Sequence, residues 1–375
     1  MTRWWLAAVA VVTVFFVARG LTVPGDLTDL DVYRAGGASW LHGSPLYTDE
    51  FPFWLPFTYP PVAAVLFGAL AILPLVAAAT LLTAAGLVGL SLASFGAVPH
   101  RAVALLAVTG GVLLEPVRTT LTFGQVNLVL MGLVAADCLL GRTRWPRGLL
   151  VGLAAAVKLT PAVFILFFLA RRQPGAAVTA TVTFAAATSA GMLLAPADSL
   201  RYWHTTIFDP SRIGGGEFAT NQSLRGALAR LGLPEVCWVV LVLVVLALAW
   251  RGARRAAEPV VALLVVALLV VAAAGLLVSP VSWSHHWVWI VPAVFVFAVR
   301  LYRNRRGMVA LAAVVVAFAF GHRFLPHARQ RELEWTWWQH VLGNSYVLVA
   351  MAFLIWCATT RLARTPAPVR EVAAA

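Results

Sequence analysis

Two aspartates, Asp29 and Asp31, stand two positions apart directly after the first apolar stretch of the chain, in the segment Thr28-Asp-Leu-Asp-Val-Tyr-Arg34. Two carboxylates at this spacing repel each other, which raises the pKa of one of them towards the range that a general base needs. The same pair suits a metal ion. It is also typical of a solvated loop or of the first turn of a helix, and the motif is too short to decide among these interpretations.

Lys158 is the only lysine in the chain, and it lies in the middle of an apolar segment, in Ala156-Val-Lys-Leu-Thr-Pro-Ala162. An ammonium group at the centre of a membrane costs at least about 2.5 kcal/mol, so we expect it to face an interior cavity and a partner. A lipid-linked phosphate is one candidate partner. The alternatives are a structural acid, or a side chain that extends to the membrane interface.

Two adjacent histidines, His285 and His286, lie among three serines and three tryptophans in residues 279–289. Tryptophan at such a place is typical of a membrane interface, but imidazoles there can also stabilise a leaving phosphate. Neighbouring residues of a helix do not share a face, so we expect only one of the two to point inward. Two histidines without a third ligand at a usable spacing are weak evidence for a metal.

Amide side chains recur at two places. Gln125 and Asn127 follow the segment Glu115-Pro-Val-Arg118, in which we expect an ion pair, at one end of an apolar segment. Asn221 and Gln222 end a glycine-containing loop. Amides bind sugar hydroxyls, but they also cap and cross-link membrane helices, and both interpretations stay open.

The elements that must position these residues are membrane helices. The chain has 375 residues, of which 61% are hydrophobic and only 11% charged, whereas soluble domains average about 25% charged residues. This composition indicates a polytopic, all-α membrane protein and excludes a soluble enzyme, a secreted disulfide scaffold and a disordered protein. The three cysteines have no metal-ligand spacing and are expected to be buried thiols.

The net charge of +13 comes largely from short arginine clusters between apolar segments. This is the pattern of cytoplasmic loops under the positive-inside rule, so we expect membrane lipids and no nucleic acid as partners. We predict an uncleaved first span at residues 4–17 and about twelve crossings or half-crossings in all. The other apolar segments are residues 60–98 (broken at Pro74), 102–114, 126–140, 148–170, 175–194, 236–250, 260–278, 287–299, 308–320 and 346–359.

Nearly all acidic residues then fall on the outer side of the membrane, which we expect to carry the chemistry. We predict a single membrane domain over residues 1–364, a short cytoplasmic tail at 365–375, and outer segments at 21–58, 197–234, 279–286 and 321–344. The topology between residues 60 and 174 has two solutions. If the arginines on both sides of segment 148–170 face the cytoplasm, this segment enters and returns as two half-helices hinged at Lys158-Leu-Thr-Pro161; otherwise it is one kinked span.

With these residues in place, the chain resembles the actinobacterial polyprenol-phosphate-mannose-dependent α-(1→2)-mannosyltransferases of glycosyltransferase family 87, in the membrane-embedded GT-C class. It resembles most the enzymes that branch lipomannan and lipoarabinomannan, because the phosphatidylinositol-mannoside elongating enzyme is expected to have His at the position of Asp31. The whole set of motifs in this order is specific: Asp29-Leu-Asp-Val-Tyr-Arg, Leu41-His-Gly-Ser-Pro-Leu-Tyr47, Phe57-Thr-Tyr-Pro-Pro61, Phe123-Gly-Gln-Val-Asn127, Lys158-Leu-Thr-Pro161, Asn221-Gln-Ser and Ser279-Pro-Val-Ser-Trp-Ser-His-His-Trp287.

The resemblance implies a GT-C fold in the plasma membrane, with the active site on the outer face. It implies a polyprenyl-phosphate-mannose donor and a mannoside glycolipid or lipoglycan acceptor, whose hydroxyl attacks the anomeric carbon with inversion. An aspartate of the first outer loop, here Asp29, is the implied base, and Asp31 either orients it or contacts sugar. No cofactor and no obligatory metal are expected, although the aspartate pair leaves metal dependence open.

From charge and motif position we place Lys158, Arg34 and one of His285 and His286 around the leaving phosphate. The predicted sugar or acceptor contacts are Tyr33, Tyr59, Gln125, Asn127, Asn221, Gln222 and Trp283. Three alternatives remain: a transporter or flippase of lipid-linked sugars, a transferase of another polyprenyl-phosphate-linked sugar, and a non-catalytic scaffold. The transporter predicts an inverted repeat, which the sequence does not show.

Overall fold

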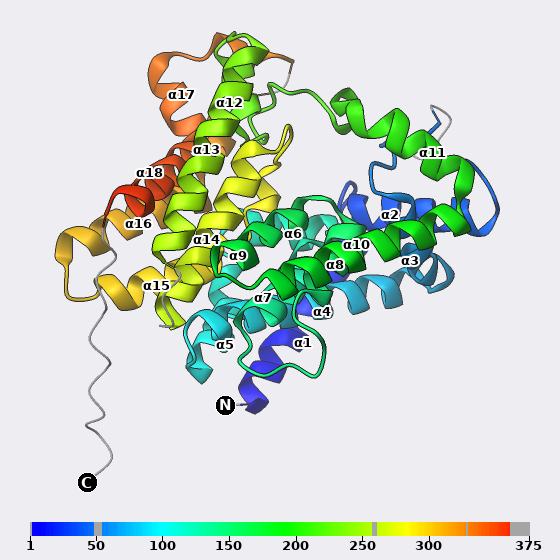
Figure 1. Ribbon diagram of the computed structural model, residues 1–375, viewed down its shortest axis with the longest axis horizontal. Coiled ribbons are helices and arrows are strands. Elements are labelled where there is room, and N and C mark those ends of the chain that lie inside the picture. The colour runs from blue at the N-terminus through cyan, green and yellow to red at the C-terminus, as the bar shows by residue number, and fades with distance from the viewer. Residues whose placement is uncertain (1, 49–54, 257–260, 328, 361–375) are drawn as a thin grey trace.

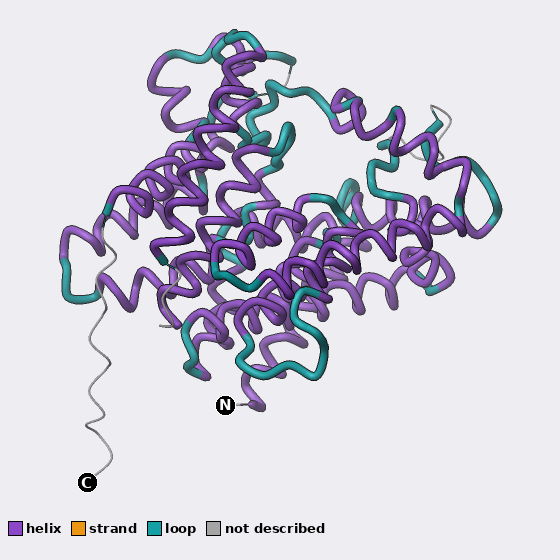
Figure 2. Tube along the Cα trace, viewed as in Figure 1, coloured by secondary structure: helices purple, strands orange, loops and turns teal. Residues whose placement is uncertain are grey.

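The computed structural model describes residues 2–48, 55–256, 261–327 and 329–360, and all regular elements in these ranges are helical (Figure 2). The all-α prediction is confirmed for this part of the chain. The helices are α1 (Thr2–Thr22), α2 (Thr28–Leu41), α3 (Pro61–Ile72), α4 (Leu75–Ala97), α5 (Arg101–Gly111), α6 (Glu115–Phe123), α7 (Asn127–Leu139), α8 (Leu149–Val157), α9 (Ile165–Ala170), α10 (Pro174–Leu194), α11 (Pro196–His204), α12 (Leu224–Arg230), α13 (Glu235–Arg255), α14 (Val261–Val278), α15 (Ile290–Leu301), α16 (Arg305–Ala319), α17 (Trp337–Gly343) and α18 (Ser345–Thr359).

Six short 3-10 turns connect these helices. They are η1 (Thr160–Phe164), η2 (Thr206–Phe208), η3 (Pro210–Ile213), η4 (Ser284–His286), η5 (Gly321–Phe324) and η6 (Arg331–Glu334). The predicted outer segments are therefore folded rather than open loops, since α2, α11, α12, η4 and α17 lie within them. The predicted tail at 365–375 and residues 49–54 of the first outer segment lie outside the described residues.

Four described helices, α1, α4, α10 and α13, are long and apolar enough to cross a membrane. Two further helix pairs, α5–α6 and α17–α18, are bent by 72° and 71°. If each pair is one broken span, the described residues contain up to six candidate membrane spans. Five shorter apolar helices of 10–17 residues accompany them. The chain is thus a multi-pass membrane protein, and the expected number of about twelve crossings stays a prediction.

Both predicted helix breaks occur. Helix α3 ends at Ile72 and Pro74 caps α4, because proline lacks the N–H that a helix interior needs. Helix α8 ends at Val157, Lys158 is extended, and η1 begins at Thr160. The second break interrupts the segment that holds the only lysine.

The segment 148–170 enters and returns on one side of the structure. Arg147 precedes it and Arg171 follows it, yet the two guanidinium groups are close enough to repel each other. Both also lie near the thiol of Cys138 at the end of α7. Of the two predicted topologies, the structure therefore favours two half-helices hinged at Lys158.

Helices α4 and α7 cross closely at the centre of the molecule. A Cβ atom on Gly89 would lie 2.3 Å from the carbonyl oxygen of Leu128, and one on Gly132 would lie 2.5 Å from the Cα of Gly89. Only glycine allows the backbones to approach so far, as in other membrane helix pairs. This crossing fixes the start of α7, where Asn127 lies.

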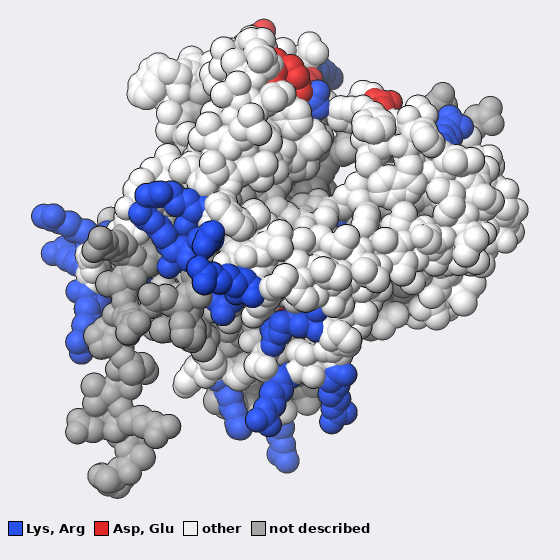
Figure 3. All heavy atoms as spheres, in the orientation of Figure 1, with Lys and Arg blue, Asp and Glu red and all other residues white. Residues whose placement is uncertain are grey.

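Helices α13 to α18 gather on one side of the molecule, and α2, α3, α10 and α11 on the other (Figure 1). The turn η1 packs against α14, and the preceding helix α8 packs against α10, so this segment joins the two groups. Arginine side chains cover the lower left of the same view, over one end of the helices, whereas the visible acidic atoms lie at the opposite end near α12 (Figure 3). The molecule therefore has one strongly basic end.

Candidate active site

Helix α2 places Asp29 and Tyr33 on one face, since residues four apart are neighbours on a helix. The N–H of Leu27 donates to the carbonyl of Thr122 at 2.8 Å, which holds the start of α2 against the end of α6. The hydroxyl of Tyr33 donates to Oε1 of Gln125 at 2.7 Å. The first outer segment is thereby joined to the turn between α6 and α7.

The carboxyl group of Asp29 is recessed but keeps some exposure to solvent. Burial raises its pKa to about 6, while a hydrogen bond with Gln125 and the positive charge of Lys158 act in the opposite direction. At neutral pH the group is mostly a carboxylate whose proton affinity is higher than that of a free aspartate. These are the properties of a general base.

The turn between α6 and α7 supplies two amides. Gly124 adopts φ 65°, a left-handed conformation that suits glycine, and it ends α6. Gln125 and Asn127 follow directly, and both are buried. Asn127 donates through Nδ2 to the carbonyl of His285 at 3.2 Å and accepts at Oδ1 from Lys158 at 3.0 Å.

Lys158 lies at the break between α8 and η1, where its ammonium group meets three other segments. Besides the bond to Asn127, its Nζ lies 3.1 Å from Nε2 of His286 and 5.6 Å from the ring centre of Tyr59. A protonated lysine has three N–H donors and no acceptor, so Nε2 of His286 is the acceptor. One of the three donors remains outside these two hydrogen bonds.

The two histidines have different surroundings, which answers the question that the sequence left open. His286 faces Lys158 and lines a cavity, whereas the ring of His285 lies behind it against Phe123. Burial, and then the charge of Lys158, lowers the pKa of His285 to about 3 and that of His286 well below its usual value. Both imidazoles are therefore neutral at physiological pH.

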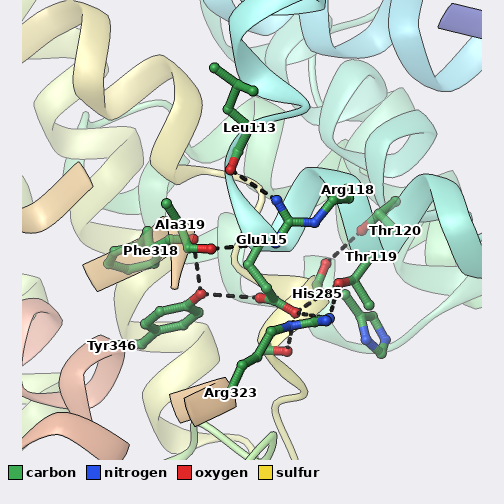
Figure 4. A network of polar contacts seen from close by, with 11 residues as sticks. Leu113, Glu115, Arg118, Thr119, Thr120, His285, Phe318, Ala319, Arg323 and Tyr346 are labelled. Carbon is green, nitrogen blue, oxygen red and sulfur yellow. Dashed lines mark hydrogen bonds and ion pairs between the residues drawn. The ribbon is translucent and has the colours of Figure 1, made fainter. Parts of the chain in front are cut away.

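Glu115, at the start of α6, ties η5 and α18 to the histidine turn η4 (Figure 4). Its buried carboxylate accepts from Ser284 at 2.9 Å, from Arg323 at 3.1 Å and from Tyr346 at 3.1 Å. The expected ion pair with Arg118 is wrong, because Arg118 donates to backbone carbonyls and Arg323 is the partner of Glu115. No local pattern indicates this partner, which lies 208 residues away.

Lys158, Asn127 and His286 form the polar part of the wall of a cavity of about 50 Å³, whose remaining wall is mostly apolar. Its wall continues through Leu276 and Trp289 into an apolar groove of about 650 Å³ between α14, α15, α16 and α18. Sequence reasoning missed Trp289 as a wall residue, because tryptophan at the end of an apolar segment is equally typical of a membrane interface. The Lys158 cavity therefore offers polar contacts to a charged head group, and the groove offers an apolar surface to a long tail.

Two residues predicted for the site lie elsewhere. Arg34 donates to the carbonyls of Leu70 and Leu73, both at 2.6 Å, and so caps the end of α3. Asp31 is half-buried on α2. Burial raises the pKa of its carboxyl group, while the nearby charge of Arg34 acts in the opposite direction. No contact joins Asp31 to Lys158. Neither residue is brought to the Lys158 cluster.

Asn221, Gln222 and Trp283 lie where two loops pair. Asn221 and Trp283 form an isolated β-bridge, and Oδ1 of Asn221 accepts from the N–H of Ser282 at 3.0 Å. Gln222 is fully buried and donates to the carbonyls of Ala219 and Gly343. These two amides hold the segment that precedes the histidines and do not reach the cavity of Lys158.

Metal ligands do not gather at the aspartate pair. Within the part of the chain that the structure describes, no group of three or more His, Cys, Asp or Glu side chains has the arrangement to hold a metal ion. The described site is built instead from a carboxylate, an ammonium group, amides and neutral imidazoles.

The chain is similar to known proteins over most of its length. The model of glycosyltransferase family 87 matches residues 57–280. A polyprenol-phosphate-mannose-dependent alpha-(1-2)-phosphatidylinositol mannoside mannosyltransferase of Mycolicibacterium smegmatis is 42% identical over 377 residues, which cover 90% of this chain and 84% of the relative. The protein of the same name from Mycobacterium tuberculosis is 41% identical over 397 residues, which cover 96% and 91%.

A third relative, the polyprenol-phosphate-mannose-dependent alpha-(1-2)-phosphatidylinositol pentamannoside mannosyltransferase of Mycolicibacterium smegmatis, is 36% identical over 365 residues, which cover 90% of this chain and 86% of the relative. No solved structure matches the chain. The family match spans more than half of the chain, and the relatives span nearly all of it. The chain belongs to glycosyltransferase family 87.

Proposed function

We propose that this glycosyltransferase moves mannose from polyprenyl-phosphate-mannose to a mannose hydroxyl of a glycolipid, in α-(1→2) linkage, on the outer face of the plasma membrane. The names of the relatives supply the donor, the linkage and the class of acceptor. One structural observation carries the proposal: Lys158 lines a cavity that shares the wall residues Leu276 and Trp289 with the apolar groove, and the charge of Asp29 lies nearby.

The donor has a charged phosphate and a long prenyl chain, and the two surfaces suit these parts. Lys158 offers the phosphate an N–H donor that its bonds to Asn127 and His286 leave free. The groove beyond Trp289 offers the prenyl chain an apolar wall. Because the groove lies between helices of a membrane protein, the donor enters from the bilayer rather than from water.

Asp29 acts as the base in the proposed reaction. Its carboxylate accepts the proton of the attacking mannose hydroxyl, and the hydroxyl oxygen bonds to the anomeric carbon of the donor. The bond between this carbon and the phosphate oxygen breaks at the same time, with inversion. The polyprenyl phosphate leaves with the electron pair, and Lys158 stabilises its negative charge.

His286 supports this step without carrying charge. A neutral imidazole that accepts from Nζ fixes the direction of the Lys158 ammonium, and it does not compete with it for the phosphate. Tyr33 is joined by hydrogen bonds to Tyr59 and Gln125 beside Asp29, and these hydroxyl and amide groups suit the sugar.

The acceptor is a mannoside of phosphatidylinositol in the names of both close relatives. Lipomannan and lipoarabinomannan remain candidate acceptors, because the aspartate at position 31 is the residue that we expect in the enzymes that branch them. Both classes present a mannose hydroxyl on a lipid anchor, so the same site serves either one. The arginine-covered end then faces the cytoplasm, and the Lys158 site opens on the outer side of a GT-C fold.

The test is transfer of labelled mannose by purified protein in lipid vesicles. Polyprenyl-phosphate-mannose is supplied with a phosphatidylinositol mannoside in one reaction and with lipomannan in another. The proposal predicts a product with a new α-(1→2)-mannose in at least one of them. Movement of the donor across the bilayer without transfer to either acceptor would instead indicate a flippase.

A further inference from the structure

A second pocket lies apart from the Lys158 cavity, between the segment that follows α11 and the start of α13. Its volume is about 430 Å³. No residue that lines the Lys158 cavity lines this pocket. Its wall contains Ser211, Arg225, Glu235, Trp238 and Val281.

An ion pair beside an aromatic ring dominates the wall. Nε of Arg225 lies 2.7 Å from Oε1 of Glu235, and its guanidinium group lies 5.5 Å from the ring centre of Trp238. Arg225 keeps 29% of its side-chain surface exposed and Glu235 keeps 56%, so both remain accessible to a ligand.

These groups suit a neutral ligand with many hydroxyls. The carboxylate of Glu235 neutralises Arg225, so the pair offers both donors and acceptors but little net attraction for a lone phosphate. Trp238 adds an apolar ring face, which fits the C–H face of a pyranose. A sugar presents the hydroxyls and the apolar face together.

The pocket is joined to the active site by one short stretch of backbone. Val281 lines the pocket and His286 lines the Lys158 cavity. Five residues span at most roughly 18 Å when fully extended, which is the reach of a short oligosaccharide. The stretch is held in place, because Ser282 accepts from the N–H of Gln222 at 2.8 Å and Ser284 donates to the carbonyl of Thr220 at 2.7 Å.

We propose that this pocket binds a mannose unit of the acceptor glycan that lies away from the reacting hydroxyl. The inference rests on the proposed function for the identity of the acceptor. It makes Trp238 and Glu235 residues that select long acceptors, since the pocket and the Lys158 cavity share no wall residue and a single mannose cannot occupy both.

The test compares two acceptors, a synthetic glycolipid with one mannose and one with several mannoses, in the mannose-transfer assay. Trp238→Ala is expected to lower the ratio of kcat/KM for the long acceptor to that for the short acceptor by about tenfold. Trp250→Ala is the matched control. Trp250 lies on the same helix, and its ring centre lies 5.4 Å from the guanidinium group of Arg254, but it does not line the pocket. Its ratio is expected to stay at the wild-type value.

Glu235→Gln serves as a second variant, because its exposed side chain has little effect on folding. It is expected to lower the same ratio, and an unchanged ratio in both variants would overturn the proposal. Binding of soluble mannotriose, measured by saturation-transfer NMR, separates this proposal from the proposed function. If mannotriose binding is lost in Trp238→Ala but the protein never transfers mannose, the pocket is supported and the proposed function is not. If the protein transfers mannose but mannotriose binding is unchanged in Trp238→Ala, the function is supported and the pocket is not.

Discussion

The ammonium group of Lys158 lies 3.1 Å from Nε2 of His286, a residue 128 positions later in the chain. The first of these residues stands at a helix break and the second in a 3-10 turn, so neither belongs to a regular membrane helix. Both side chains therefore sit where the backbone leaves helical structure, and buried polar contacts hold them there.

The transfer rate is expected to rise with pH around the pKa of Asp29, which is about 6. A base must be deprotonated to act, so kcat/KM increases by about tenfold per pH unit well below pH 6 and approaches a plateau by about pH 7. The neutral histidines add no second inflection in this range, since their pKa values lie lower. The measurement is kcat/KM from pH 4.5 to pH 7.

Gln125→Leu moves this inflection to higher pH, because it removes the hydrogen bond that stabilises the Asp29 carboxylate. The same pH series measures the shift. A profile without an inflection in the wild type, or an activity that falls as the pH rises through 6, would contradict Asp29 as the base.

Lys158→Met is expected to lower kcat/KM by roughly 10²- to 10³-fold, because the leaving phosphate loses its only nearby ammonium group. The kinetics are measured at saturating acceptor with varied donor. Arg34→Met is the control, since Arg34 donates to carbonyls at the end of α3 and not to the Lys158 cluster. Folded Arg34→Met protein is expected to keep most of its activity, and an equal loss in both variants would place Arg34 in the site.

Glu115→Ala is expected to destabilise the protein by roughly 2 to 3 kcal/mol, because it leaves Arg323, Ser284 and Tyr346 without their shared acceptor. Thermal unfolding in lipid nanodiscs measures the loss. Glu235→Ala breaks the more exposed pair with Arg225 and is expected to cost less than about 1 kcal/mol. Similar losses in the two variants would show that the Glu115 network does not hold the fold.

Much of the site was predictable from residue type. An ammonium group in an apolar segment, an aspartate after the first span and histidines at a segment end each stand out against a membrane composition. The helix breaks at Pro74 and before Pro161 follow from the chemistry of proline itself. Asp29, Lys158 and the pair His285 and His286 were therefore predictable as candidates, whereas the choice between the two histidines was not.

The remaining features depend on tertiary contacts that local sequence does not encode. Nothing near Arg34 indicates that it caps α3, and nothing near Asn221 indicates that it pairs with the histidine segment. The pairing of Glu115 with Arg323, rather than with Arg118 three positions away, arises from the approach of η5 to α6. The sugar pocket at Trp238 likewise forms only when the loop after α11 meets α13.

The most direct test of the account compares Asp29→Asn with Asp31→Asn in the mannose-transfer assay. Asparagine keeps the shape of the side chain but cannot accept the proton, so Asp29→Asn is expected to lower kcat by about 10²- to 10⁴-fold while donor binding persists. Asp31 lies with Arg34 outside the Lys158 cluster, so Asp31→Asn is expected to keep most of the activity. Full activity in Asp29→Asn would contradict the assignment of Asp29 as the base. So would a loss of the predicted size in Asp31→Asn while Asp29→Asn stays active.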